Sequence, residues 1–226
     1  MVHHPENTRL GVPYFDGNGR LTQYVEKPQN PPHDFAIPGL YFMDQNGYKC
    51  FHSDDKLKPS ARGEYEIPDA YQWLINHDYR IDVREYKGKW LDPGKFGDWL
   101  ETNQYLLDAN TSHAISSAID ASVKIEGRVM IGNDCQIKNT IIRGPVNIGN
   151  NVIIEDSFIG PYTSIYHKCN LKKCRIENSV LMEEVQIDNI VKPIDTSLIG
   201  PGSKINSNNS GNTIKVFLGE LSEISL

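Results

Sequence analysis

Five charged side chains in the first half of the chain are of the types that bind hydroxyls, phosphates or metal ions. They are Glu26 with Lys27, Arg62 with Glu64, and Asp92. Carboxylates accept hydrogen bonds and bind hard cations such as Mg²⁺, and cationic side chains bind phosphate oxygens. Taken alone, the first pair is more typical of a solvated strand end, and Asp92 before Pro-Gly is typical of a turn. Whether these residues form a binding site depends on the helices and strands that position them.

The overall composition limits the kind of protein that this is. The chain has 226 residues, a formal net charge of −6, 38% hydrophobic residues and 23% charged residues, which suits one large globular domain or two small ones. No stretch approaches the ~18 consecutive apolar residues of a membrane helix, and the N-terminus has no signal-peptide pattern. The four cysteines are far apart, which disfavours a disulfide framework or a zinc site. We therefore expect a reduced, cytoplasmic protein with no membrane or nucleic-acid partner.

The first half mixes strand-like and helix-like patterns. Alternating segments predict strands at Leu10–Phe15, Leu21–Val25, Ala36–Phe42 and Arg80–Tyr86, and helical spacing predicts helices at Ile67–Asn76 and Phe96–Leu107. The turn residues Asp16-Gly17-Asn18-Gly19 join the first two strands into a hairpin. The first half is therefore predicted to be α+β or mixed α/β.

After residue 113 the period of the sequence changes to six. The hexads begin at Ile119, Ile125, Ile131, Ile137, Ile148, Ile159, Ile165, Leu181 and Ile199. An aliphatic residue opens each hexad and a small or β-branched residue is fifth, and both are expected to point inward. Such hexads build a parallel β-helix, with eighteen residues expected per three-sided coil. We expect its flat sides to serve as supports or as a surface for homo-oligomers, and the final stretch 213–226 to close the last coil.

The motifs of the first half occur in an order that resembles one enzyme family. They are Glu26-Lys27-Pro28, Gly39-Leu40-Tyr41-Phe42, Arg62-Gly63-Glu64-Tyr65-Glu66-Ile67 and Trp90-Leu91-Asp92-Pro93-Gly94. Together they resemble the sugar-binding half of glucose-1-phosphate thymidylyltransferases, over about residues 8–108. The hexad region is similar to the C-terminal left-handed β-helix of the long form of that family.

The resemblance implies a reaction and a set of site residues. In this family a sugar 1-phosphate and a nucleoside triphosphate give a nucleotide sugar and pyrophosphate. By resemblance, Glu26 and Glu64 accept hydrogen bonds from sugar hydroxyls, while Lys27 and Arg62 hold the sugar phosphate. Asp92 matches one of two aspartates that bind Mg²⁺.

Three further residues of these motifs are assigned to the sugar site on the same resemblance. Gly39 allows the backbone to approach the sugar, with a strand bulge as its alternative. Tyr41 contacts the sugar, although a tyrosine in an alternating strand is as often part of the core. Trp90 packs beneath the site. The preferred substrates are glucose 1-phosphate with dTTP or UTP.

Two parts of the family pattern are missing. The Gly-rich GxGTRL loop that holds the triphosphate and the first Mg²⁺ aspartate do not occur, and Gly17-Asn18-Gly19 lies in a hairpin turn rather than before a helix. The chain is therefore interpreted as catalytically incomplete by itself. It is a fragment of a longer enzyme, a split-gene product that needs a separate nucleotide-binding polypeptide, or a diverged module that binds sugar phosphates.

Two other functions remain open at this point. Hexad β-helices are common in acyltransferases that use a histidine base, and the histidines of this region are His113 and His167. Alternatively, the chain is a non-catalytic oligomerisation or regulatory subunit. The resulting interpretation is a partial, mixed-sheet α/β nucleotidyltransferase half-domain at residues 1–110, followed by an all-β left-handed parallel β-helix at residues 114–226.

Overall fold

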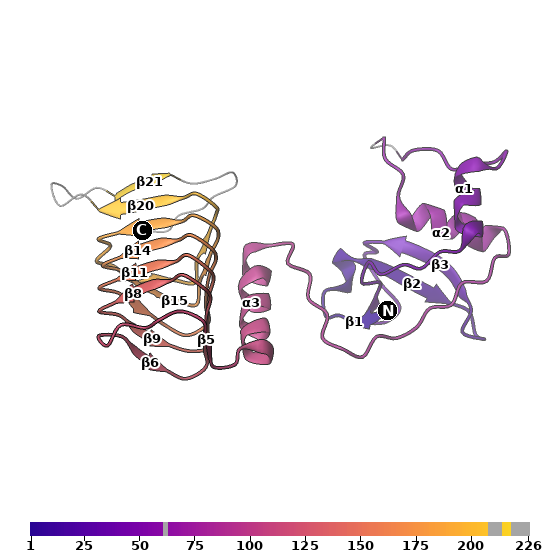
Figure 1. Ribbon diagram of the computed structural model, residues 1–226. Coiled ribbons are helices and arrows are strands. Elements are labelled where there is room, and N and C mark those ends of the chain that lie inside the picture. The colour runs from indigo at the N-terminus through magenta and orange to yellow at the C-terminus, as the bar shows by residue number, and fades with distance from the viewer. Residues whose placement is uncertain (61–62, 208–213, 218–226) are drawn as a thin grey trace. The chain divides into compact units, whose positions relative to one another are not determined.

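The computed structural model describes residues 1–60, 63–207 and 214–217. The chain forms two compact units, Met1–Trp90 and Leu91–Leu226 (Figure 1). No helix among the described residues combines the length and the apolar composition that crossing a bilayer requires.

The first unit is built on an antiparallel hairpin with one longer helix. Its elements are β1 (Val2–His3), η1 (Asn7–Arg9), β2 (Gly11–Phe15), β3 (Leu21–Glu26), β4 (Phe35–Ala36), η2 (Gln45–Tyr48), α1 (Lys49–His52) and α2 (Ile67–Asn76). The predicted hairpin is confirmed: Asp16 Oδ1 accepts from the backbone N–H groups of Asn18 and Arg20, at 2.9 Å each, and closes the turn. Helix α2, also predicted, has Ala70, Tyr71, Trp73 and Leu74 buried.

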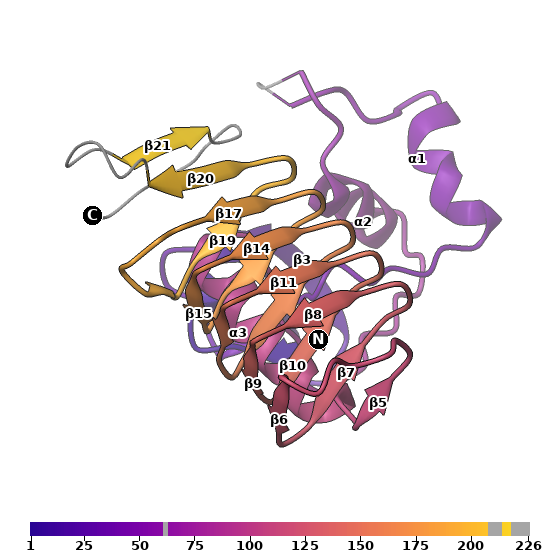
Figure 2. The same ribbon diagram turned by 60° about the vertical axis from the view of Figure 1, so that its left-hand side comes forward.

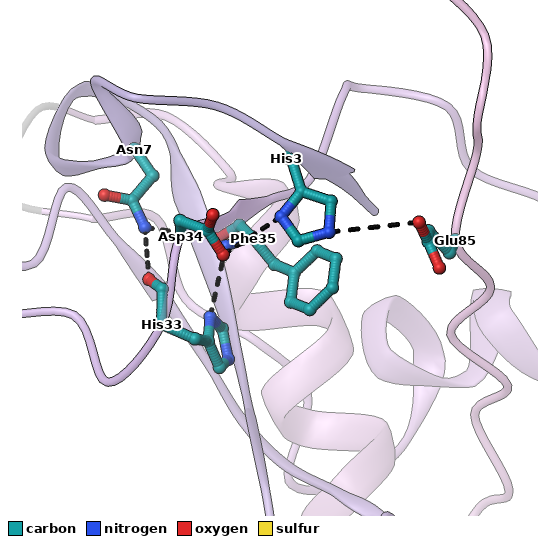
Figure 3. Close-up of polar contacts among 6 residues, drawn as sticks. All are labelled: His3, Asn7, His33, Asp34, Phe35 and Glu85. Atoms are coloured by element: carbon teal, nitrogen blue, oxygen red, sulfur yellow. Dashed lines mark hydrogen bonds and ion pairs between the residues drawn. The ribbon is translucent and has the colours of Figure 1, made fainter.

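A short second sheet places β1 beside β4. His3 Nδ1 lies 3.0 Å from an Asp34 carboxylate oxygen, and Asn7 Nδ2 donates to the backbone carbonyls of His33 and Phe35 (Figure 3). The His3 hydrogen bond lowers the pKa of Asp34. These contacts hold the N-terminal segment against β4.

Two predicted strands are largely absent, which corrects the sequence-based expectation. Of Ala36–Phe42, only Ala36 lies in a strand and Ile37 makes one isolated bridge to Gly11; Arg80–Tyr86 is not a strand. Both segments have a strand-like alternation, but a strand needs a neighbour to receive its backbone hydrogen bonds. Arg80–Tyr86 meets the start of β1 near its end, where the Met1 amine donates to the Arg84 carbonyl at 2.6 Å and the Tyr86 N–H donates to the Met1 carbonyl at 2.7 Å. This contact is too short to form a strand.

The second unit begins with α3 (Phe96–Asn110) and continues as a three-sided solenoid of parallel strands. We name each side by one of its strands. The β13 sheet contains β5 (Ala114–Ile115), β7 (Val129–Ile131), β10 (Val146–Ile148), β13 (Thr163–Ile165), β16 (Val180–Leu181) and β19 (Leu198–Ile199). The β12 sheet contains β6 (Lys124–Glu126), β9 (Ile141–Arg143), β12 (Phe158–Ile159), β15 (Arg175–Glu177) and β18 (Ile194–Asp195).

The third side, the β14 sheet, ends differently from the other two. It contains β8 (Gln136–Lys138), β11 (Ile153–Glu155), β14 (Asn170–Lys172), β17 (Gln186–Asp188), β20 (Lys204–Ser207) and β21 (Ile214–Phe217). Figure 2 shows these strands in order, with β21 beyond β20. Strand β21 pairs antiparallel with β20. This pairing covers the last parallel edge of that side. The sequence predicted that residues 213–226 close the last coil; of these, residues 213 and 218–226 lie outside the described residues.

The hexads stack as the sequence predicted, and the fold is the expected left-handed β-helix. One inward column of the β14 sheet is Ile137, Ile154, Leu171 and Ile187, each at most 2% exposed. The fifth positions Val152, Thr163, Cys169 and Val185 are also buried. The inside of the coils is therefore filled mainly by apolar side chains, with Thr163 as a buried polar exception among these positions.

The coils are shorter than the expected eighteen residues at most levels. Ile137 pairs with Ile154, 17 residues later, because the side from Ile137 to Ile142 takes five residues instead of six. Asn139 turns this corner with φ +46°, a conformation that asparagine tolerates better than most residues. One expectation is consequently wrong. Ile141, fifth in its hexad, points outward and is 40% exposed, while Ile142 is fully buried.

Helix α3 belongs to the same compact unit as the solenoid and not to the first unit. Asn103 Nδ2 donates to the Tyr162 carbonyl at 2.9 Å, Ser164 Oγ lies 2.5 Å from Asn103 Oδ1, and Arg128 bonds to Asp108 at 2.9 Å. The compact units thus divide at Trp90, whereas the sequence-based boundary was placed at residue 110.

Truncation of one inward isoleucine tests how much the stacked core stabilises the solenoid. We expect Ile154→Ala to lower the free energy of unfolding by about 2–5 kcal/mol, since it leaves a cavity between two coils. The neighbouring outward residue gives the matched control, because Ile153→Ala removes the same atoms from a half-exposed position. Urea unfolding followed by circular dichroism measures both; equal losses would contradict this account of the core.

Candidate functional site

A largely apolar cavity of about 800 Å³ lies in the first unit. Strand β3, helix α2, the segment Ile37–Asp44 and the segment Tyr79–Tyr86 line it. Tyr24, Tyr41 and Tyr71 bring their rings to this cavity from three different elements. Cavities that bind small molecules are typically lined in this way, by apolar and aromatic side chains with a few polar groups.

The three tyrosines form one cluster. The Tyr24 and Tyr41 hydroxyls lie 2.7 Å apart and share a hydrogen bond, and the Tyr41 and Tyr71 ring centroids are 5.3 Å apart. Burial raises the pKa of Tyr24, and the hydrogen bond to Tyr41 and the charge of Glu26 raise it further. Burial likewise raises the pKa of Tyr41 and Tyr71. All three side chains therefore stay neutral hydrogen-bonding groups in this cavity up to high pH.

A glycine on the neighbouring strand makes room for this cluster. Gly11 begins β2 beside β3, and a Cβ atom built there would overlap with the Tyr24 ring. Sequence reasoning treated Gly11 only as the start of a strand and did not single out Tyr24 or Tyr71. The signals that were available are the position of Tyr24 two residues before Glu26 and the place of Tyr71 on the apolar face of α2.

Glu26 and Lys27 are at the end of β3, next to the cluster. Lys27 Nζ lies 3.6 Å from Glu26 Oε1, and both side chains are substantially exposed. Lys27 has φ +50°, so the chain changes direction there before Pro28. The negative charge of Glu26 raises the pKa of both Tyr24 and Tyr41. The structure thus brings Glu26 and Tyr41, two residues assigned by resemblance, into one electrostatic neighbourhood.

The backbone conformation at position 39 is one that favours glycine. Its φ is +70°, a region that other residues rarely adopt, and a Cβ atom there would meet nothing within 4 Å. The backbone at Gly39 is exposed and open to an approaching molecule. This geometry leaves room for the predicted contact with a ligand, although no atom of the described chain makes a close approach here.

The remaining assigned residues are less closely gathered. The half-buried Trp90 ring packs edge-on against His4, with centroids 5.5 Å apart. Glu64 is exposed, and its backbone carbonyl accepts from the Ser60 N–H at 2.8 Å. Residue Glu66, not Glu64, is the N-cap of α2. Arg62 lies outside the described residues.

The donor set for a metal ion is incomplete in the described chain. Asp92 is exposed in the turn before α3, where its carbonyl accepts from the Gly94 N–H at 2.7 Å. No group of three or more His, Cys, Asp or Glu side chains is arranged to hold a metal among the residues that the structure describes. Mg²⁺ requires about six oxygen ligands, so Asp92 does not hold it alone.

Large apolar side chains beside the cavity are exposed. Phe42 is 87% exposed and Leu40 is 67% exposed, both in the segment that was predicted to be a strand. Monomeric proteins rarely leave a contiguous apolar patch uncovered. Unpaired backbone and exposed apolar side chains thus coincide in this segment.

The solenoid histidine His167 has a structural position. Its Nδ1 accepts from the backbone N–H of Asn150 at 2.8 Å, one coil away, and a Cβ atom on Gly149 would lie 2.8 Å from the same nitrogen. Asn150 Oδ1 in turn accepts from the Asn133 N–H at 2.8 Å. His167 therefore continues a ladder of side chains that satisfies the backbone along this corner.

The tyrosine cluster leads to a prediction about alkaline titration. In the folded protein Tyr24, Tyr41 and Tyr71 should remain un-ionised above pH 10, the ordinary value, because burial raises their pKa. Their contribution to stability is then present below pH 10 and is lost as the pH rises through the raised values. Phenolate absorbance should show fewer ionised tyrosines in the native chain than in urea at the same pH. Tyr24→Phe should remove one late-ionising group; simultaneous ionisation of all tyrosines near pH 10 would contradict the prediction.

Comparisons with known proteins agree with the motif order and with the fold. Residues 1–109 match the nucleotidyl transferase family. The chain is 31% identical over its whole length to a glucose-1-phosphate thymidylyltransferase of Streptomyces antibioticus, 62% of which it covers. It is 33% identical, over 91% of its length, to a low-salt glycan biosynthesis nucleotidyltransferase of Haloferax volcanii, 56% of which it covers.

A third relative combines two named activities. It is a bifunctional sugar-1-phosphate nucleotidylyltransferase/acetyltransferase of Sulfurisphaera tokodaii. The two sequences are 34% identical over 80% of this chain, and this chain covers 45% of that relative. The chain thus spans about half to three fifths of the length of these relatives. The motifs of the first unit, the hexad solenoid and these similarities agree: residues 1–109 match the nucleotidyl transferase family, and the chain as a whole is similar to sugar-1-phosphate nucleotidyltransferases.

Proposed function

We propose that this chain provides the sugar-phosphate-binding part of a nucleotidyltransferase of the glucose-1-phosphate thymidylyltransferase type. The observation that carries the proposal is the cavity lined by Tyr24, Tyr41 and Tyr71, in the unit that matches the family. Glu26 is near enough to this cluster for its charge to raise the pKa of Tyr24 and Tyr41. The proposed sugar substrate is glucose 1-phosphate, and the proposed nucleotide is dTTP or UTP. The names of the relatives support this substrate class.

The polar groups at the end of β3, near the tyrosine cluster, suit a sugar phosphate. The exposed Glu26 carboxylate accepts hydrogen bonds from sugar hydroxyls, and the tyrosine rings offer apolar faces to the C–H side of a sugar ring. Lys27, 3.6 Å from Glu26, supplies positive charge to the phosphate. Arg62, Glu64, Gly39 and Trp90 complete the proposed sugar site on the family motifs.

In the proposed reaction a phosphate oxygen of the sugar phosphate attacks the α-phosphorus of the nucleoside triphosphate. A new phosphorus–oxygen bond forms there, and the bond from the α-phosphorus to the oxygen that bridges it to the β-phosphate breaks, which releases pyrophosphate. No covalent intermediate with the protein is required. The contribution of this chain is to orient the sugar phosphate and to offset its charge.

The nucleotide and its metal need groups that the described chain does not supply. The proposed cofactor is Mg²⁺, which provides charge neutralisation when bound, and Asp92 is the proposed ligand from this chain. The other ligands and the triphosphate-binding loop come from a nucleotide-binding polypeptide part. The exposed Phe42 and Leu40, in an extended segment that is a strand only at its start, are consistent with docking of such a part by strand pairing.

Binding of glucose 1-phosphate to the purified chain tests the sugar site directly. We expect Lys27→Ala and Arg62→Ala each to weaken binding roughly tenfold to a hundredfold, because each removes a charge-assisted contact to phosphate. The matched control Lys138→Ala removes the same charge from the solenoid and should leave the affinity unchanged. Titration calorimetry measures all four proteins; no binding by the unaltered chain, or equal loss with Lys138→Ala, would contradict the sugar site.

Pyrophosphate release tests the need for a complementary part. The chain alone, with glucose 1-phosphate, dTTP or UTP, and Mg²⁺, should release no pyrophosphate. Addition of the nucleotide-binding region of a family member should restore release, and Asp92→Asn should lower the restored rate while sugar-phosphate binding is retained. Release by the chain alone would show that its own residues form a nucleotide site.

A further inference from the structure

The end of helix α2 carries a histidine whose two ring nitrogens both face hydrogen-bond acceptors. His77 Nδ1 lies 2.8 Å from the backbone carbonyl oxygen of Trp73, and His77 Nε2 lies 2.8 Å from a carboxylate oxygen of Asp55. A carbonyl oxygen and an ionised carboxylate only accept hydrogen bonds. Both ring nitrogens must therefore carry a proton for both bonds to form, and the ring is then a cation.

The surroundings of the His77 ring favour a positive charge. The ring stacks on the Trp73 indole, with centroids 3.7 Å apart and planes at 17°, so the protonated form gains a cation–π contact. His77 follows the last turn of α2, which has no basic residue, at the helix end where a cation is favoured. The side chain is 36% exposed, so water screens these contacts in part.

The charged groups on the neighbouring elements have partners of their own or lie in exposed positions. Asp78, next to His77 in the chain, pairs with Arg20 of the hairpin at 3.3 Å, and Lys49 of α1 bonds to the Tyr79 hydroxyl at 3.1 Å. The remaining titratable side chains of α1 and of the segment after it are exposed and are His52, Asp54 and Lys56. In the ion pairs that the structure describes, the cation beside Asp55 is His77.

The same contacts connect the segment after α1 to one wall of the cavity. Trp73 Nε1 donates to the Asp55 backbone carbonyl at 3.2 Å, so Trp73 and His77 together hold both the backbone and the side chain of Asp55. Trp73 and Leu74 belong to one buried cluster, and Tyr79 packs against it. Leu74 and Tyr79 also line the cavity of about 800 Å³. These contacts of His77 therefore lie behind the cavity wall that α2 provides.

We propose that His77 is a proton-dependent positioning residue, which in its doubly protonated form holds Asp55 against Trp73 and so fixes the α2 wall of the cavity. Histidine is the side chain that ordinarily changes charge between pH 5 and 8. The stabilisation is present where His77 is protonated and Asp55 is ionised, and it is lost as the pH rises and the ring releases a proton. The consequence for ligand binding rests on the sugar site proposed above.

A permanent cation at position 77 separates the effect of the proton from that of the fold. His77→Arg keeps a planar cation that stacks on Trp73 and pairs with Asp55 throughout this pH range, whereas His77→Gln is neutral throughout it. Urea unfolding followed by tryptophan fluorescence measures each variant at about pH 6 and about pH 8. The unaltered chain should be more stable than His77→Gln at the lower pH, and most of this difference should disappear at the higher pH. The advantage of His77→Arg over His77→Gln should be the same at both.

Two further variants test the partner and the specificity of the effect. Asp55→Asn should remove most of the pH dependence, and a double-mutant cycle with His77→Gln should find coupling at the lower pH only. His52→Gln is the matched control, because it removes an exposed histidine from α1, and it should keep the pH dependence of the unaltered chain. A pH dependence that survives in His77→Gln, or that is lost in His52→Gln, would overturn the proposal.

Titration calorimetry with glucose 1-phosphate tests the effect on the cavity. The ligand phosphate itself titrates in this range, so the affinity of the unaltered chain is divided by that of His77→Arg at the same pH. This ratio should fall roughly threefold or more between the lower and the higher pH. A constant ratio would show that His77 only stabilises the fold and would overturn its positioning role. Absence of binding by every variant at both pH values would contradict the sugar site, and the unfolding experiment would then decide by itself whether the contacts of His77 depend on its proton.

Discussion

The solenoid depends on one constraint, the parallel stacking of each coil on the one before it. Backbone hydrogen bonds between coils hold Ile137, Ile154 and Leu171 at the same place in successive turns. The chain can repeat this only if it turns three corners per coil without losing register. Residues with positive φ make those turns, as Asn139 and Asp156 do at one corner. The hydrogen bond between these two side chains, at 3.1 Å, reinforces the ladder there.

This regularity also determines what the solenoid presents outward. Because neighbouring residues of a strand point to opposite faces, each buried isoleucine has outward neighbours that fall in straight columns. The five-residue side between Ile137 and Ile142 shifts the alternation by one, so Ile141 and Phe158 become outward residues of the β12 sheet. The number of residues at one corner thereby determines which side chains of the β12 sheet point outward.

The first unit has no repeated stacking of this kind. Its hairpin and α2 satisfy their own backbone groups, but Ile37–Asp44 and Arg80–Tyr86 are extended without strand partners over most of their length. The apolar side chains of these segments line the cavity or, like Phe42, are exposed. The tyrosine cluster packs closely, since Gly11 leaves space for the Tyr24 ring and the Tyr24 hydroxyl bonds to Tyr41. The tyrosine cluster and these extended segments therefore line the same cavity.

The sequence by itself determined the elements whose pattern is local. The hexad period located the solenoid and its buried column, the turn residues after Asp16 located the first hairpin, and helical spacing located α2. The ordered motifs, from Glu26-Lys27-Pro28 to Asp92, indicated the family. Each of these signals depends on residues close together in the chain, so no knowledge of distant contacts was needed.

Only the tertiary structure decided the features that depend on distant partners. Strand-like alternation in Arg80–Tyr86 did not produce a strand, because a strand requires a neighbour that the pattern cannot supply. The pairing of Tyr24 with Tyr41, and the ladder role of His167, arise from residues 17 positions apart that folding brings together. Ile141 shows the same limit within the repeat: the hexad placed it inside, and the geometry of one corner turned it outward.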